Sequence, residues 1–201
     1  FDQIANPLLR DLSLMRIIEP CSKLRTVSLL KRYFDISYPI NTVYQKLRNI
    51  RQVKKHIETI AVSYAKHNLG FNFSLVFYDV TTLYFETHTA DADMQDSDGN
   101  TIAGLRTHGF SKDNKSHQPQ IVIGLVVNSE GYPIAVHTFS GKTFEGHTMI
   151  PVIKQLQKQH TIKTLTVVAD AGMLSMDNIQ AIKDASLNYI VGARLGNISH
   201  K

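Results

Sequence analysis

Residues 75–86 have the sequence LVFYDVTTLYFE, and this stretch decides the fold of the chain. Its β-branched and aromatic residues, uninterrupted by glycine or proline, predict a buried β-strand. One acid, Asp79, lies in the middle of the stretch. An ionised carboxylate is costly to take out of water unless a partner compensates its charge. That partner is either local, from the threonines that follow or a nearby basic residue, or it is a bound cation.

A second strand of the same kind favours the cation. Residues 165–172 have the sequence LTVVADAG, in which Asp170 follows an apolar run. Asp170 lies 91 residues after Asp79, and a mixed sheet would bring the two strands together. Two carboxylates a few ångströms apart repel each other unless a divalent cation neutralises them. Because such hard oxygen ligands suit Mg²⁺ or Mn²⁺, the sequence predicts a metal site at Asp79 and Asp170.

The composition is that of a folded protein from a reducing compartment. Of the 201 residues, 43% are hydrophobic and 19% are charged, which argues against a disordered chain. A single cysteine, Cys21, excludes an internal disulfide framework. No apolar run is long enough to span a bilayer, and no signal-peptide pattern is present. We therefore expect an intracellular protein.

The charge divides the chain at about residue 70. Residues 1–70 hold 12 Lys/Arg against 5 Asp/Glu, whereas residues 71–201 hold 10 against 12. A basic front and a mildly acidic back are expected of a nucleic-acid-binding region joined to a carboxylate-bearing core. We expect two domains, a helical basic region over residues 1–70 and a core over residues 71–201. The alternative is a basic helix that faces only solvent.

The predicted helices of the front region supply this basic surface. Two short helices are expected before residue 35, the second capped by Ser22, and one long helix from Asn41 to about His67, ended by Gly70. One face of the long helix is basic and carries Lys46, Arg48, Arg51, Lys54 and Lys55. Of these, the predicted contacts to DNA phosphates are Arg51, Lys54 and Lys55. The pattern does not establish a helix-turn-helix, although the short helices leave room for one.

In the core, the predicted order is strand, long loop, strand hairpin, helix, strand, helix, strand. The hairpin joins residues 120–127, aliphatic and expected to be buried on both faces, to residues 132–139. A hairpin followed by alternating helices and strands predicts a mixed sheet with helices packed on it. The acid-rich segment around Asp98 and Gly99 lacks the spacing of a calcium loop, so we expect a solvated loop or hairpin turn there.

Several motifs, taken in their order along the chain, resemble one family. They are Tyr78–Glu86, Gly109–Asp113 with Pro119, Gln120, Gly124 and Leu125, Gly141–Gly146, Val168–Ser175 and Tyr189–Leu195. Together they resemble the DDE transposases of bacterial insertion sequences, of the IS4 type and more narrowly the IS1634 type. The resemblance covers about residues 70–196. It implies an α/β fold, a ribonuclease-H-like mixed sheet with flanking helices, preceded here by the all-helical region.

The resemblance also implies a function. Asp79 and Asp170 would be the first two catalytic acids and would hold two Mg²⁺ (or Mn²⁺) ions. These ions would activate water, and then a 3′-hydroxyl, for strand cleavage and strand transfer at transposon ends. Three further residues would contact DNA, although each also fits a plain surface charge: Lys112, Lys142 and Arg194. The partner would be double-stranded DNA, both terminal inverted repeats and target, bound by a dimer at the nucleoid of a bacterial cytoplasm.

One departure from the family pattern concerns the third acid. In this family it is a Glu on a helix beyond the last strand, and no Glu follows Tyr189 in this chain. We therefore expect a fragment that lacks the third acid and is inactive by itself. Two alternatives stay open. One is another ribonuclease-H-like nuclease, which cuts junctions or RNA hybrids, and the other is a non-catalytic DNA-binding protein derived from a transposase.

Overall fold

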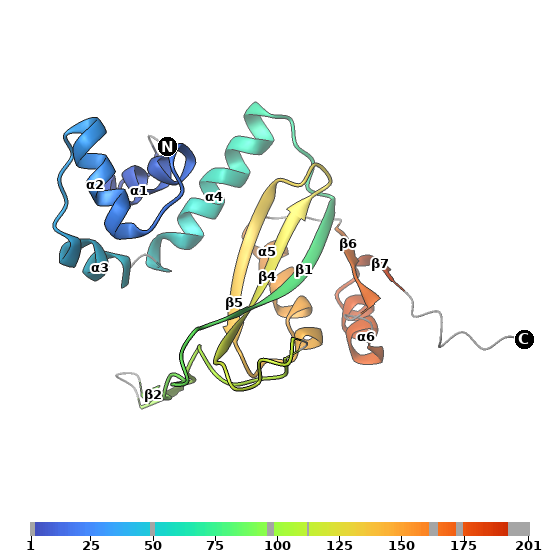
Figure 1. Cartoon of the computed structure of the whole chain (residues 1–201). Coiled ribbons are helices and arrows are strands. Elements are labelled where there is room, and N and C mark those ends of the chain that lie inside the picture. Colours follow the sequence, from blue (N-terminus) through green and yellow to red (C-terminus); the bar gives the residue numbers. More distant parts are fainter. Residues whose placement is uncertain are drawn as a thin grey trace, which may run out of the picture. The chain divides into compact units, whose positions relative to one another are not determined.

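The computed structural model describes residues 3–48, 51–95, 99–111, 113–160, 165–171 and 175–192 (Figure 1). The chain divides into two compact units, Phe1–Tyr64 and Ala65–Lys201, named here the helical unit and the sheet unit. Within the described residues, no helix is both long and apolar enough to cross a membrane.

The helical unit begins with two capped helices. Its elements are α1 (Pro7–Ile18), α2 (Lys23–Phe34), α3 (Ile40–Arg48) and most of α4 (Arg51–Asn68). The Asn6 side chain accepts a hydrogen bond from the N–H of Leu9, and Ser22 accepts one from the N–H of Arg25, as the sequence predicts for Ser22. Apolar side chains of α1 and α2 form a buried core of Met15, Leu29 and Leu30.

The single long helix predicted from Asn41 to about His67 is wrong. Two helices, α3 and α4, lie on either side of residues 49–50 and run in different directions (Figure 1). Apolar periodicity continues through this break and neither Gly nor Pro marks it, so the sequence pattern does not reveal it. The predicted end is confirmed, because Gly70 has a φ of 65° and the N–H of Phe71 bonds to the carbonyl of Ala65.

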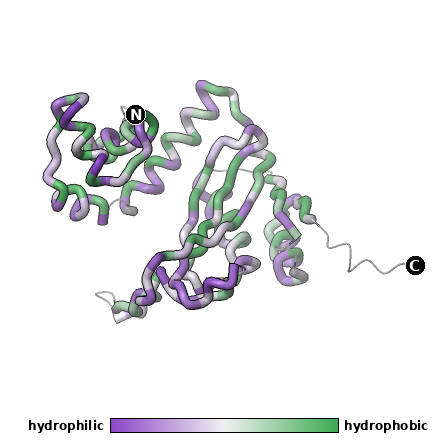
Figure 2. Tube along the Cα trace, viewed as in Figure 1, coloured by the Kyte–Doolittle hydropathy of each residue, from purple (hydrophilic) through white to green (hydrophobic). Residues whose placement is uncertain are grey.

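The sheet unit contains a five-stranded sheet of order β5-β4-β1-β6-β7. The strands are β1 (Leu75–Tyr84), β4 (Gln120–Asn128), β5 (Pro133–Ser140), β6 (Thr166–Ala169) and β7 (Asn188–Val191). β1 pairs antiparallel with β4 and parallel with β6, so the sheet is mixed. Apolar segments follow the strands, as the green parts of Figure 2 show. The predicted α/β architecture, a mixed sheet with flanking helices preceded in sequence by an all-helical region, is confirmed.

One face of the sheet is covered by α5 (Met149–His160) and α6 (Met176–Asp184). The buried Tyr78 of β1 donates a hydrogen bond to Thr148, which directly precedes α5, so α5 lies on this face. The side chain of Asn178 in α6 donates to the carbonyl of Gly146, which ties α6 to the same side. The apolar face of α5 is buried through Met149, Val152, Ile153 and Leu156.

Two further predictions concern the hairpins. β2 (Met94–Gln95) and β3 (Thr101–Ile102) pair antiparallel, which confirms a hairpin around Gly99, while Asp98 lies outside the described residues. The prediction that residues 120–127 are buried on both faces is wrong. Burial alternates along β4, and Leu125 is 38% exposed, because no described helix covers the second face of the sheet.

Candidate functional site

The register of β1 and β6, continued two residues beyond its last pair, aligns Asp79 with Asp170, and these two positions are named here the acid row. β1 and β6 are parallel neighbours, and their last paired residues are Phe77 and Val168. Asp79 and Asp170 each follow two residues later, so the 91-residue offset of the pairing is also the offset of the two acids. Neighbouring strands lie about 4.8 Å apart, and side chains of one row point to the same face. This extrapolated register would place both carboxylates near the carboxyl end of β6.

Both acids are exposed, which corrects the expectation of a buried carboxylate at Asp79. Side chains alternate along β1, so Val76 and Tyr78 face α5 and are buried, whereas Phe77 and Asp79 face the other way. The desolvation cost inferred from the sequence is therefore not incurred.

Apolar side chains surround the two acids on this open face. Leu125 is the direct cross-strand partner of Asp79, and Val136 is the partner of Leu125. On β7, Ile190 pairs with Val168 in the next row. These side chains are 38% (Leu125), 39% (Val136) and 59% (Ile190) exposed.

Tyr78 is a positioning residue that the sequence analysis did not identify. Its hydroxyl donates to Oγ1 of Thr148 at 2.7 Å, and that hydroxyl in turn donates to the carbonyl of Glu145 at 2.6 Å. Burial raises the pKa of Tyr78 to about 12; the nearby charges of Asp79 and Glu145 add to this rise and the bond to Thr148 opposes it. This chain of bonds fixes β1 directly beside Asp79. The sequence signal for this close packing is Gly124, a glycine inside an apolar strand. A Cβ there would lie 2.4 Å from the Tyr78 hydroxyl.

A second set of hydrogen bonds holds the loops next to the end of β1 and the start of β4. The Gln120 side chain is 1% exposed and donates to the carbonyl of Phe110 at 3.0 Å and to that of Gly141 at 2.9 Å. The backbone N–H of Lys142 donates to the Thr107 hydroxyl at 2.9 Å. The loops that carry the predicted DNA contacts are therefore tied to the start of β4.

The structure does not bring Lys142 to the two acids. Ser140, two residues before Lys142, lies in the row of Leu83, which is four residues beyond Asp79 along β1. Four residues of strand span roughly 13 Å, so the exposed Lys142 lies at a different part of the sheet. Lys112 and Arg194 lie outside the described residues.

The predicted basic residues of α4 differ from one another. Lys54 forms an ion pair with Glu58 one turn later, at 2.7 Å, whereas Lys55 is exposed. The side chain of Arg51 lies outside the described part of the structure.

The donor set at the acid row fits Mg²⁺ or Mn²⁺. These hard cations are bound through one or two carboxylates, with water and substrate phosphate completing the shell. Asp79 and Asp170 provide two such carboxylates on an accessible face. Among the described residues, no group of three or more His, Cys, Asp or Glu could hold a metal ion. Further oxygen ligands have to come from elsewhere.

Comparison with known proteins points to one kind of domain. The model of the family described as "Transposase DDE domain" matches residues 72–199. No curated protein matches the chain. Among solved structures, the Mos1 transposase paired-end complex with left transposon end matches with a TM-score of 0.36 and 11% identity, over 90% of this chain and 57% of that chain. The Drosophila P element transposase strand transfer complex matches with a TM-score of 0.44 and 11% identity, over 90% of this chain and 40% of that one.

Proposed function

This chain belongs to the family of transposase DDE domains, and we propose that it is part of a DNA transposase that cleaves and joins transposon ends. The observation that supports the proposal is the parallel pairing of β1 with β6, whose register has the same 91-residue offset as Asp79 and Asp170. Within the family we place the protein with the IS4-type, IS1634-like transposases of bacterial insertion sequences. The reaction is then a DNA recombination by two-metal-ion phosphoryl transfer.

In this proposal the two aspartates bind and orient, and they do so from an open surface. Their oxygens hold Mg²⁺ or Mn²⁺; when bound, a pair of such ions roughly 4 Å apart stabilises the attacking and leaving oxygens of phosphoryl transfer. Tyr78, the buried neighbour of Asp79 in sequence, ties β1 to Thr148 at the start of α5. Because both acids are exposed, a DNA backbone can approach the row without the opening of a buried cavity.

The partners follow from the same proposal. Double-stranded DNA, both terminal inverted repeats and target, is the substrate, bound by a dimer at the bacterial nucleoid. Lys142, Lys112 and Arg194 contact DNA, and Lys142 does so away from the acid row. Full activity requires a third acid, which the family carries as a Glu beyond the last strand, so cleavage is tested in the complete protein.

The test replaces each acid in the complete protein. Asp79→Asn and Asp170→Asn remove a negative charge and a metal ligand while keeping the side-chain shape. We expect each to lower cleavage of transposon-end DNA more than about 100-fold, because loss of a ligand exceeds the usual effect of outer-shell changes. Binding of the same DNA in EDTA is expected to stay within about twofold of wild type. Asp177→Asn, at an exposed acid in the first turn of α6, is the matched control and is expected to keep full activity.

The outcomes separate the candidate functions. Cleavage that survives in either variant removes that aspartate from the site. Cutting of junctions or RNA hybrids without joining of transposon ends would favour another ribonuclease-H-like nuclease. Binding of inverted repeats without cleavage, with both Mg²⁺ and Mn²⁺ supplied, would favour a non-catalytic DNA-binding protein.

A further inference from the structure

The outward face of α3 carries four polar or aromatic side chains in one stripe. Asn41, Tyr44, Gln45 and Arg48 are all exposed, and they follow the spacing i, i+3, i+4, i+7. At about 100° per residue these positions fall within about 100° of arc on the helix surface. The opposite face is inward, with Val43 at 0% exposure. A helix of nine residues thus presents one compact polar surface, and the break after α3 is what separates it from α4.

The turn before α3 holds this face firmly in place. Asp35 ends α2 in the left-handed conformation, with φ 54°, and the N–H of Ile36 bonds back to the carbonyl of Leu30 at 3.2 Å. Tyr38, in the same turn, donates to the buried carboxylate of Asp11 in α1 at 2.6 Å. The α2–turn–α3 segment is therefore anchored to α1, and a face held in this way loses little conformational entropy when it binds.

The positive charge of the chain is concentrated on the same segment. Residues 22–48 hold six Lys/Arg and one Asp/Glu, a balance of +5. The rest of the chain has 16 Lys/Arg and 16 Asp/Glu, so the whole net charge of +5 resides on these 27 residues. The basic side chains on α2 are exposed; Arg25 forms an ion pair with Glu19 at 2.6 Å, so the phosphate contacts are expected from Lys23, Lys31 and Arg32. A strongly cationic helix pair with no acid on either helix is complementary to a polyanion.

We infer that α3 lies in the major groove of DNA and reads base edges through Asn41, Tyr44, Gln45 and Arg48. This rests on the proposed function, which makes DNA the partner, and it names the residues that select the DNA sequence. Asn and Gln side chains bond the N6 and N7 edge of adenine, and Arg bonds the O6 and N7 edge of guanine. The basic side chains of α2 then contact the phosphates on either side, as the first helix of such a pair does.

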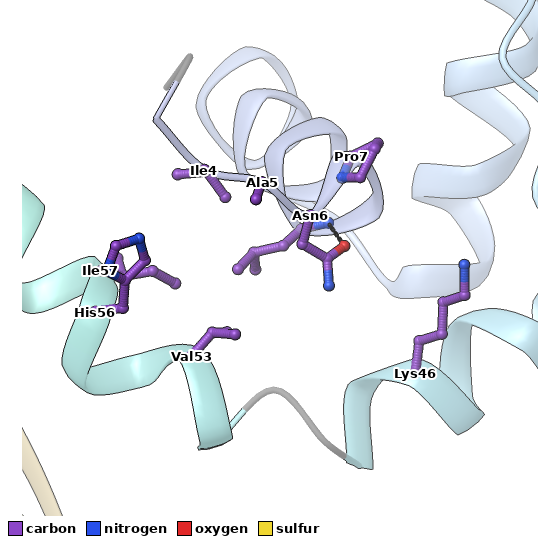
Figure 3. A pocket seen from close by; sticks show the side chains of 9 residues that line it. Ile4, Ala5, Asn6, Pro7, Lys46, Val53, His56 and Ile57 are labelled. Carbon is purple, nitrogen blue, oxygen red and sulfur yellow. Dashed lines mark hydrogen bonds between the residues drawn. The ribbon is translucent and has the colours of Figure 1, made fainter.

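Lys46 provides a control on the same helix. It lies about 140° around the helix from Asn41. There it lines an open pocket with Asn6 and Pro7 of α1 and with Val53 and His56 of α4 (Figure 3). It is exposed and basic, like Arg48, but it belongs to another side of α3. A general loss of positive charge can thus be distinguished from a loss of base contacts.

The test selects DNA with the chain of residues 1–201 in EDTA, from a library of duplexes with a random core of about 20 base pairs. Wild type is expected to enrich a sequence. Gln45→Ala, Asn41→Ala and Arg48→Ala are each expected to lower the preference for the enriched duplex over a scrambled one by roughly 5- to 150-fold, the value of one bidentate base contact. Lys46→Ala is expected to weaken both duplexes alike and to leave the preference unchanged.

Each outcome decides the inference. If wild type enriches no sequence, or if the α3 variants keep the wild-type preference while their circular dichroism is unchanged, α3 does not read bases. If Lys46→Ala lowered the preference for the enriched duplex as much as the other α3 variants do, the effect would come from positive charge and not from base contacts. Because the selection contains no divalent metal, it does not depend on cleavage. A chain that selects a sequence through α3 and yet never cuts, even in the complete protein, would disprove the proposed function and leave this inference intact.

Discussion

The helical unit and the sheet unit position their candidate functional residues in opposite ways. In the sheet unit, the proposed pairing of Asp79 with Asp170 depends on the register of two strands whose paired residues lie 91 positions apart. In the helical unit, the outward face of α3 belongs to nine consecutive residues, and one turn determines how it is presented. The first surface depends on long-range packing, whereas the second depends on local hydrogen bonds. We therefore expect substitutions in the sheet unit to act through long-range packing, and substitutions in the helical unit to act through local hydrogen bonds.

The two units also use charge differently. Residues 22–48 carry the whole net positive charge of the chain, mostly on exposed side chains that cost little to keep in water. In the proposed site, the acid row would bring two like charges close together, which is unfavourable until a cation joins them. The positive surface is thus suited to attract a polyanion over some distance, and the acid row to bind it at short range through metal.

The largest expected effect on stability is at Gly141, where distant segments of the sheet unit meet. A Cβ there would lie 2.2 Å from the carbonyl oxygen of Gln120 and 2.3 Å from that of Thr107. Both are backbone atoms, so Gly141→Ala has to shift the start of β4, and we expect a loss of about 3 kcal/mol in the free energy of unfolding. Urea unfolding of residues 1–201 measures it.

Gly99→Ala is the matched control for this substitution. Gly99 has φ +80° but no atom within 4 Å of an added Cβ, so only backbone strain of about 1 kcal/mol is expected. Equal losses in the free energy of unfolding would show that Gly141→Ala acts through backbone strain alone. The stability of the sheet unit would then not depend on close packing at Gly141.

Tyr38 and Tyr78 provide a matched pair, one in each unit. Tyr38 donates to the buried carboxylate of Asp11, and Tyr78 donates to the neutral hydroxyl of Thr148. Hydrogen bonds to charged groups contribute more, so Tyr38→Phe is expected to cost about 2 kcal/mol and Tyr78→Phe about 1 kcal/mol in the free energy of unfolding. Urea unfolding of both variants measures the difference. The reverse order would contradict the importance of the turn anchor.

The same pair predicts a dependence on pH. Burial, mainly, raises the pKa of each tyrosine from 10.0 to about 12, and the bond to Asp11 adds to the rise at Tyr38. The unfolded chain therefore loses these protons first, and the free energy of unfolding is expected to fall as pH rises from about 10 to about 12. Thermal unfolding at pH 9 to 12 should show a shallower fall in each Phe variant than in wild type.

The sheet and its acids are predictable from the sequence for a physical reason. Runs of β-branched residues have few alternatives to a buried strand, and the turn at residues 128–131 leaves little choice of pairing for β4 and β5. The separation of Asp79 and Asp170 along the chain equals the separation of the paired residues of β1 and β6. The exposure of Asp79 could not be predicted in the same way, because it depends on which face α5 covers.

The helical unit shows what periodicity alone misses. The apolar pattern runs through residues 49–50, so it predicts one helix where there are two. The pattern therefore cannot predict that α3 has an outward face of its own. The bond from Tyr38 to Asp11 joins residues 27 apart, and nothing in the local pattern indicates it.

The smallest expected effect concerns the phosphate contacts predicted on α4. Changing Arg51, Lys54 and Lys55 together to alanine should weaken DNA binding and its dependence on salt.

The structure sharpens this prediction, because Lys54 already pairs with Glu58 whereas Lys55 is exposed. Lys55→Ala is expected to lower the slope of log K against log salt by about 1. The double variant Lys54→Ala/Glu58→Ala keeps the net charge and should leave that slope unchanged in binding titrations from low to moderate salt. If Lys55→Ala also leaves the slope unchanged, α4 faces only solvent, and DNA binding by the helical unit rests on α2 and α3.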